Sequence, residues 1–313
     1  MTNGDQHATI PRPWRLVLSG GGTGGAYWMA GTLEALAGAG LNLASAELIV
    51  GTSAGALMGS VIALGGRPWD LVGNVSSPAG TLADASVRRA AQQRPTDFLR
   101  RRLMPSMGVR LSAAIGSLLP VGGHSIDHVE SLVRDIIRPG VVPHQGLRIC
   151  TVERLSARRV VFGPELEWLP KAVAASCAVP GWFVPVEIDG AYYVDGGVHS
   201  NFSLDIAADV YRARVIVLSP LTGVAPRSRD PGWLAMAVAR SELRRLLRRE
   251  IRLAMRIKAH VLVLEPDKEE VLAMGLNLMD DAHGTEIHQL ALERTRVRLS
   301  DPSWETLLSE IGV

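Results

Sequence analysis

The sequence predicts an α/β fold of three layers, in which a mainly parallel sheet lies between two layers of helices. Segments typical of short strands alternate along the chain with helical segments, which is the order that parallel sheets require. Apolar residues make up 47% of the 313 residues and charged residues 20%. That composition can fill a large buried core and excludes a disordered chain.

The N-terminal part repeats one pattern, a short apolar strand followed by a glycine turn and an apolar helix. We expect these strands at residues 15–19 and 47–50, and the helices at 25–39 and 53–64. Residues 65–122 contain five prolines and predict short helical pieces. An amphipathic helix is expected at 125–138, where Pro139 and Gly140 end it.

Strands and helices continue to alternate in the rest of the chain. A short turn joins two expected strands at 147–153 and 159–162, and a hairpin around Asp189-Gly190 joins strands at 184–188 and 192–194. The remaining expected strands are 215–218 and 260–264. We expect the remaining helices at 169–177, 204–211, 233–258 and 285–298. No linker interrupts this order, so the chain is predicted to form one domain.

Several classes of protein are disfavoured by simple patterns. Two cysteines, Cys150 and Cys177, exclude a disulfide scaffold and are typical of buried thiols in a cytoplasmic protein. Residues 1–13 lack the basic-then-apolar pattern of a signal peptide. The uncharged stretches 16–33 and 48–66 approach the length of a membrane span. Their many glycines favour the buried strand, turn and helix instead, so no transmembrane segment is expected.

Basic residues are concentrated in two segments, 86–110 and 240–258. Together these segments carry a net charge of +12 in a chain of net charge +2, so the remainder carries −10. Two interpretations stay open, namely solvated helix faces or a surface that contacts an anionic membrane peripherally. Phe98 is the only aromatic residue in the two basic segments, which argues against nucleic acid as a partner.

The first motif with chemical meaning is a glycine-rich loop between the first strand and the first helix. Backbone N–H groups can converge there on a phosphate or on a developing oxyanion. A dinucleotide site would also need an acidic residue after the second strand, and a P-loop would need Gly-Lys-Ser/Thr; neither is present. The loop consists of Gly20, Gly21, Gly22, Thr23, Gly24 and Gly25.

The second motif, Gly51-Thr52-Ser53-Ala54-Gly55, has the G-x-S-x-G form of a nucleophile elbow. Ser53 could be the nucleophile, or it could simply cap the following helix. Neighbouring parallel strands end at the same edge of a sheet. We therefore expect the elbow to face the glycine loop, an arrangement that suits acyl transfer.

The base that would activate Ser53 has two candidates. Of the eight histidines, His199 lies nearest to a motif, four residues after Asp195. Asp195 itself follows a predicted strand and precedes Gly196 and Gly197, which allow close backbone approach. An Asp-Gly-Gly sequence can also be an ordinary turn.

These motifs, in this order, resemble those of the patatin-like phospholipases. The resemblance covers residues 14–220 and includes the loop Leu18-Ser19-Gly20-Gly21-Gly22, the elbow, Ala174-Ala175-Ser176-Cys177-Ala178-Val179-Pro180-Gly181, and Tyr193-Val194-Asp195-Gly196-Gly197. It implies a catalytic core at 14–220, which residues 221–313 complete as part of the same domain.

The resemblance also implies a reaction. Ser53 would be the nucleophile, Asp195 the general base, and the backbone of residues 21–25 the oxyanion hole, with no cofactor and no metal. The expected substrates are lipid carboxylic esters, including phospholipids. Many family members carry a basic residue where Gly24 stands, and its absence leaves open the alternative of a non-catalytic lipid-binding or regulatory protein.

Overall fold

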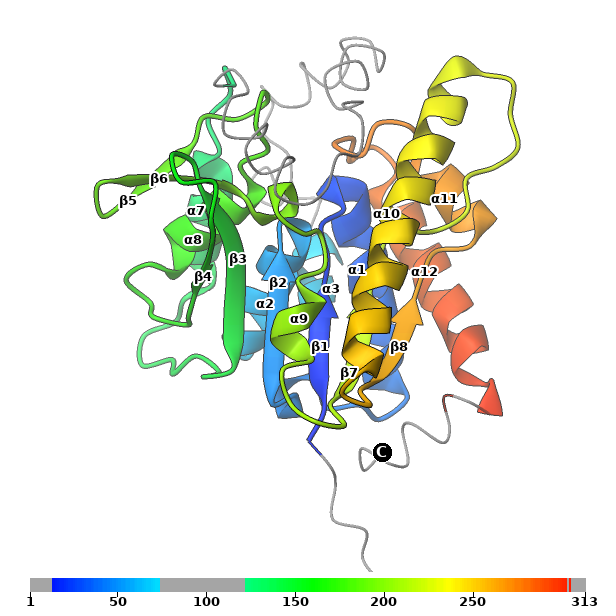
Figure 1. Ribbon diagram of the computed structural model, residues 1–313, viewed down its shortest axis with the longest axis horizontal. Coiled ribbons are helices and arrows are strands. Elements are labelled where there is room, and N and C mark those ends of the chain that lie inside the picture. The colour runs from blue at the N-terminus through cyan, green and yellow to red at the C-terminus, as the bar shows by residue number, and fades with distance from the viewer. Residues whose placement is uncertain (1–12, 74–121, 303, 305–313) are drawn as a thin grey trace, which may run out of the picture.

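A twisted sheet runs through the middle of the computed structural model, which describes residues 13–73, 122–302 and 304 (Figure 1). The strand order is β5-β6-β3-β2-β1-β7-β8, and β4 also pairs with β3. β1, β2, β3, β7 and β8 are mutually parallel, whereas β4, β5 and β6 pair in antiparallel fashion. The strands are β1 Arg15–Leu18, β2 Leu48–Thr52, β3 Leu147–Glu153, β4 Arg159–Phe162, β5 Val186–Ile188, β6 Ala191–Asp195, β7 Arg214–Leu218 and β8 His260–Leu264.

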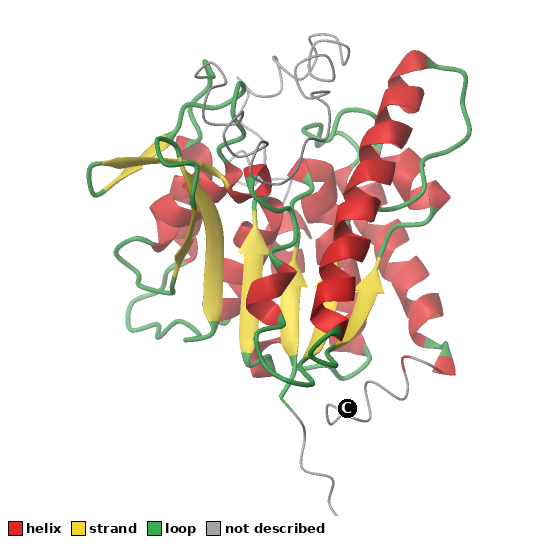
Figure 2. Cartoon of the chain, viewed as in Figure 1, coloured by secondary structure: helices red, strands yellow, loops and turns green. Residues whose placement is uncertain are grey.

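Helices cover both faces of the sheet, because successive strand side chains point to opposite sides and both sides are apolar (Figure 2). In β1, Leu16 and Leu18 belong to the larger core, whereas Val17 belongs to a second core on the other face. Helices α1 Gly22–Gly38, α2 Ala54–Ala63, α7 Asp127–Ile136, α8 Leu169–Cys177 and α12 Gly284–Leu299 contribute to the larger core. Helices α9 Leu204–Ala207 and α10 Pro231–Met255 contribute to the second. The predicted three-layer α/β fold is confirmed.

Several helices differ from the sequence prediction; α10, for example, spans Pro231–Met255 rather than 233–258. α1 begins at Gly22 rather than at residue 25, so most of the glycine loop forms its first turn. α9 ends at Ala207 rather than at residue 211, because the Ala207 carbonyl and the Asp209 carboxylate both accept hydrogen bonds from Arg15. α11, Lys268–Met274, was not predicted, although the capping box of Asp267 and Glu270 is its sequence signal.

Part of the predicted organisation lies outside the described residues. This holds for residues 1–12 and for 74–121, which include the basic segment 86–110. Of the predicted helical pieces in 65–122, the structure describes α3, Pro68–Gly73. The single domain completed by residues 221–313 stays a prediction, supported by the pairing of β8 with β7 in the same sheet. Within the described ranges, no helix is both long enough and apolar enough to cross a membrane.

Candidate active site

The register of β3 brings the elbow and the aspartate loop together. β4 pairs along one edge of β3, so β2 and β6 share the other edge in succession. On that edge Thr52 lies opposite Cys150, and Asp195 lies opposite the next residue, Thr151. Ser53 follows Thr52 directly, so it lies beside the C-terminal end of β6, where Asp195 stands.

Ser53 stands at a sharp turn between β2 and α2. Its backbone has φ 54° and ψ −125°, a conformation that side-chain-bearing residues rarely adopt and that is found at strained functional turns. The turn is tight, since a Cβ on Gly51 would lie 2.6 Å from the Ala56 Cα and one on Gly55 would lie 1.9 Å from the Leu18 carbonyl oxygen. The Ser53 side chain makes no capping hydrogen bond to α2, so the helix-cap interpretation of this serine does not hold.

A buried serine holds the elbow in place. The Ser53 N–H donates to Ser176 Oγ at 2.9 Å, and the Ser176 hydroxyl donates to the Cys150 carbonyl at 2.7 Å. Ser176 lies on α8 and is fully buried. The strained turn is thus tied to β3 through one side chain.

The glycine loop presents backbone donors beside the elbow. A Cβ on Gly20 would lie 3.2 Å from the Ser53 Cβ, so the two turns are in contact. The N–H groups of Gly24 and Gly25 donate to the carbonyls of Leu278 and Gly21. In the described part of the chain, the N–H groups of Gly21, Gly22 and Thr23 have no acceptor. These are orphan donors at the positive end of α1, so the predicted oxyanion hole of residues 21–25 narrows to three candidate donors. The Gly20 N–H, which precedes them in the loop, also has no acceptor among the described residues.

A cleft opens over these groups, with an empty volume of about 860 Å³ that includes space open to solvent. Ser53 and Asp195 both line it, and they are 9% and 6% exposed. Glycines 20–22 and Thr23 line the same cleft, whereas Gly24 and Gly25 do not. Most of the remaining lining is apolar and comes from Ala26, Leu57, Ile126, Val129, Val179, Phe183, Leu221 and Leu278.

Asp195 ends β6 and caps the short helix η2, Gly196–Val198, through a hydrogen bond that its Oδ1 accepts from the Gly197 N–H at 2.7 Å. The turn interpretation is therefore correct in part, since this aspartate shapes a turn and lines the cleft as well. Burial, and then the charge of Asp195, raise the pKa of the Cys177 thiol, while a hydrogen bond with the Ser53 side chain lowers it. Cys177 thus lies close to both Ser53 and Asp195.

Asn201 joins the two loops and was not singled out from the sequence. Its Nδ2 donates to the Gly20 carbonyl at 3.2 Å, and its Oδ1 would lie 3.3 Å from a Cβ on Gly197. The side chain is buried and lines the cleft. Its position six residues after Asp195 was the signal available in the sequence.

Two histidines, His199 and His128, differ in their position relative to the cleft. His199 does not line the cleft, and its pKa is lowered by burial and then by the positive charge of Arg159. His128 of α7 does line the cleft, where its ring centroid lies 6.4 Å from that of Phe183. Across residues 13–73 and 122–302, no cluster of three or more His, Cys, Asp or Glu is placed to hold a metal ion.

Comparisons with known proteins give one family match and two similar solved structures. Residues 16–208 match the family model described as Patatin-like phospholipase. VipD from Legionella pneumophila is similar in structure at 13% identity and a TM-score of 0.46, over 96% of this chain and 67% of VipD. The type III effector protein ExoU is similar at 17% identity and a TM-score of 0.41, over 97% of this chain and 55% of ExoU. No curated protein sequence matches the chain.

Proposed function

The chain belongs to the patatin-like phospholipase family, whose members are lipid hydrolases, and we propose from this premise that it cleaves carboxylic esters of lipids through a Ser53–Asp195 dyad. The observation that carries the proposal is the placing of a strained serine, a buried aspartate and three orphan N–H groups around one cleft. The apolar lining of that cleft suits an acyl chain.

The reaction would proceed in two acyl-transfer steps. Ser53 Oγ attacks the ester carbonyl carbon while the Asp195 carboxylate accepts the hydroxyl proton. The N–H groups of Gly21, Gly22 and Thr23 hold the oxyanion until the tetrahedral intermediate expels the alcohol, which takes the proton back from Asp195. Water then attacks the acyl-enzyme, its proton passes to Asp195 and from there to the departing Ser53 oxygen, and the fatty acid leaves.

Carboxylate catalysis of this kind depends on burial. The ordinary pKa values of an aspartate and a serine hydroxyl lie far apart, so an exposed aspartate is a weak base for serine. Desolvation raises the proton affinity of a carboxylate and makes it a stronger base. The 6% exposure of Asp195 and the apolar cleft supply that condition.

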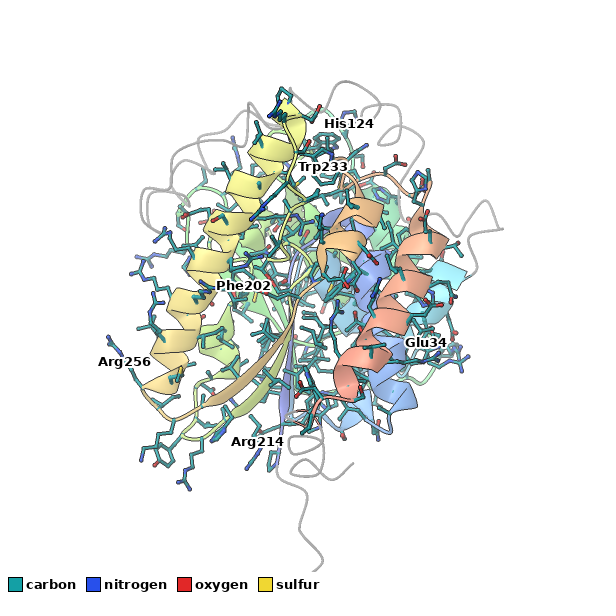
Figure 3. All side chains as sticks on the ribbon, turned by 90° about the vertical axis from the view of Figure 1, so that its right-hand side faces the viewer. Glu34, His124, Phe202, Arg214, Trp233 and Arg256 are labelled. Carbon is teal, nitrogen blue, oxygen red and sulfur yellow. The ribbon has the colours of Figure 1, made fainter. Side chains whose placement is uncertain are left out.

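We further propose that the enzyme is cytoplasmic and contacts anionic membranes peripherally. The structure describes one of the two basic segments, 240–258, which lies mainly on α10. Arg240 is buried there, and Arg244 donates to the Thr222 carbonyl, so both are poor candidates for a membrane contact. Figure 3 shows Arg256 near Arg214, the first residue of β7, and far from Trp233 at the other end of α10. The exposed arginines thus lie toward the end of the sheet opposite the catalytic loops.

A fluorophosphonate probe tests the proposed function, because it labels an activated serine covalently. Wild-type protein should be labelled and should hydrolyse at least one member of a panel of phosphatidylcholine, phosphatidylglycerol, a lysophospholipid and a triacylglycerol. Ser53→Ala should lose both properties and keep the fold, since only one oxygen is removed. Equal labelling or hydrolysis by a folded Ser53→Ala protein would overturn the proposal. Lipid binding by a wild-type protein that neither reacts with the probe nor hydrolyses any ester would support the non-catalytic alternative.

A further inference from the structure

α10 buries an arginine that has too few partners. The Arg240 side chain is 1% exposed, and its Nη1 donates to the Pro220 carbonyl at 2.9 Å. Its Nε and Nη2 have no hydrogen-bond acceptor in the part of the chain that the structure describes. Burial, and then repulsion by Arg244, lower the pKa of Arg240 to about 10, so the guanidinium stays charged at neutral pH.

No negative charge compensates this cation among the described residues. In the part of the chain that the structure describes, the charged group that affects the pKa of Arg240 is Arg244, and its effect is repulsive. Arg244 itself lies 4.0 Å from the Glu265 carboxylate, so the neighbouring arginine one turn along α10 is compensated and Arg240 is not. Burying an unpaired charge lowers stability unless a negative charge arises nearby.

The buried charge lies directly behind the glycine loop. Pro220, whose carbonyl accepts from Arg240, packs with its ring against the loop: a Cβ on Gly21 would lie 2.6 Å from the Pro220 Cγ, and one on Gly25 would lie 3.1 Å from it. Pro220 follows the end of β7 by two residues, and β7 pairs with β1. α10 passes in front of β7 in Figure 1. One residue therefore separates the guanidinium from the candidate oxyanion hole.

We propose that Arg240 supplies, through Pro220, the positive charge that stabilises the oxyanion formed at the N–H groups of the glycine loop. The proposal rests on the esterase function proposed above. Gly24 contributes no side-chain charge to the glycine loop. The Arg240 guanidinium provides a positive charge on the far side of Pro220, outside the cleft. Arg240 does not line the cleft, so it is a positioning residue and not a catalytic residue.

Two physical consequences distinguish this role from simple support of the turn. A fixed charge in a poorly polarisable interior acts on an oxyanion over several ångströms, and it acts on the transition state more than on a neutral ester. Losing the charge should therefore lower kcat and leave KM almost unchanged for an uncharged substrate. Removing an uncompensated buried charge should not lower stability in the way that removing a packed core side chain does.

The test compares Arg240→Gln, which keeps an N–H donor without charge, with Arg240→Lys, which keeps the charge. The substrate is p-nitrophenyl butyrate, whose lack of charge excludes an effect on substrate attraction. We expect Arg240→Gln to lower kcat about tenfold with KM within about twofold, and Arg240→Lys to stay within about threefold of wild type. Arg240→Met introduces an apolar side chain and should show the same kcat and KM as Arg240→Gln. It replaces Arg240→Gln in the test if the Gln variant does not fold.

The matched control is Arg244→Gln, which removes a compensated arginine from the same helix and should change kcat by less than about twofold. Equal kcat for the folded Gln and Lys variants of Arg240, or wild-type kcat in both Arg240→Gln and Arg240→Met, would overturn the proposal. These outcomes differ from a failure of the esterase function itself, since in that case wild-type protein would show neither hydrolysis nor fluorophosphonate labelling.

Discussion

Replacing Ser176 with alanine tests how the elbow is held. The substitution removes two buried hydrogen bonds, from the Ser53 N–H at 2.9 Å and to the Cys150 carbonyl at 2.7 Å. Each buried polar group left unsatisfied costs about 1–3 kcal/mol, so Ser176→Ala should lower the free energy of unfolding by about 2–6 kcal/mol. Ser53 would also be freer to leave its positive-φ conformation, a strain of about 1–3 kcal/mol, so kcat should fall about tenfold.

Ser60→Ala provides a matched control for this change. Ser60 is equally buried, but its hydroxyl only donates to the Leu57 carbonyl at 2.8 Å within α2, so its removal leaves no N–H group unpaired. Urea unfolding and ester hydrolysis should be measured for both variants. The reasoning is wrong if Ser176→Ala is no less stable than Ser60→Ala, or if it keeps wild-type kcat.

Three further changes have defined outcomes. Asn201→Ala removes the buried hydrogen bond to the Gly20 carbonyl, so it should lower kcat about tenfold and the free energy of unfolding by about 1–3 kcal/mol; an unchanged kcat would dismiss Asn201 as a link between the loops. The pKa of His199 is lowered from 6.5 in the folded state, so the unfolded state binds the proton more readily and stability falls as pH drops below 6.5. His199→Gln should therefore reduce the difference in urea midpoint between pH 8 and pH 5, and an unchanged difference would contradict this. Exposed arginines on α10 can be replaced by Gln at Arg248, Arg249, Arg252 and Arg256. Each replacement should weaken binding to anionic vesicles in co-sedimentation by about 1 kcal/mol and leave hydrolysis of a soluble ester unchanged. Unaltered vesicle binding would support a merely solvated helix face.

The main features of the fold were predictable from the sequence because they depend on local patterns. Apolar runs followed by glycine turns predicted β1 and β2, and the rule that parallel strands end at one edge predicted that the loop of Gly20 would meet Ser53. That prediction is confirmed by the parallel pairing of β1 with β2 and by the contact between the two turns. The missed helix α11 is short, and its signal was a capping box rather than a hydrophobic period.

Other features of the site depend on contacts between distant segments, which no local pattern contains. Ser176 and Asn201 were ordinary polar residues in the sequence, and their roles follow from packing against residues 123 and 181 positions away. Arg240 looked like part of a basic helix face, because a 3.6-residue period does not show that one arginine of a run faces the core. The glycine loop, likewise, offered six candidate donors in the sequence, and only the structure shows that the N–H groups of Gly24 and Gly25 already donate to the carbonyls of Leu278 and Gly21.

The central claim, that Asp195 and not a histidine activates Ser53, is tested most directly by the kcat of Asp195→Asn on an ester that wild-type protein cleaves. The amide keeps the shape of the side chain and can still accept from the Gly197 N–H, but it cannot take the serine proton. The account predicts a loss in kcat on the order of 10²–10⁴ for Asp195→Asn, and a change of less than about threefold for His199→Gln measured beside it. An active Asp195→Asn enzyme together with an inactive, folded His199→Gln enzyme would contradict the account.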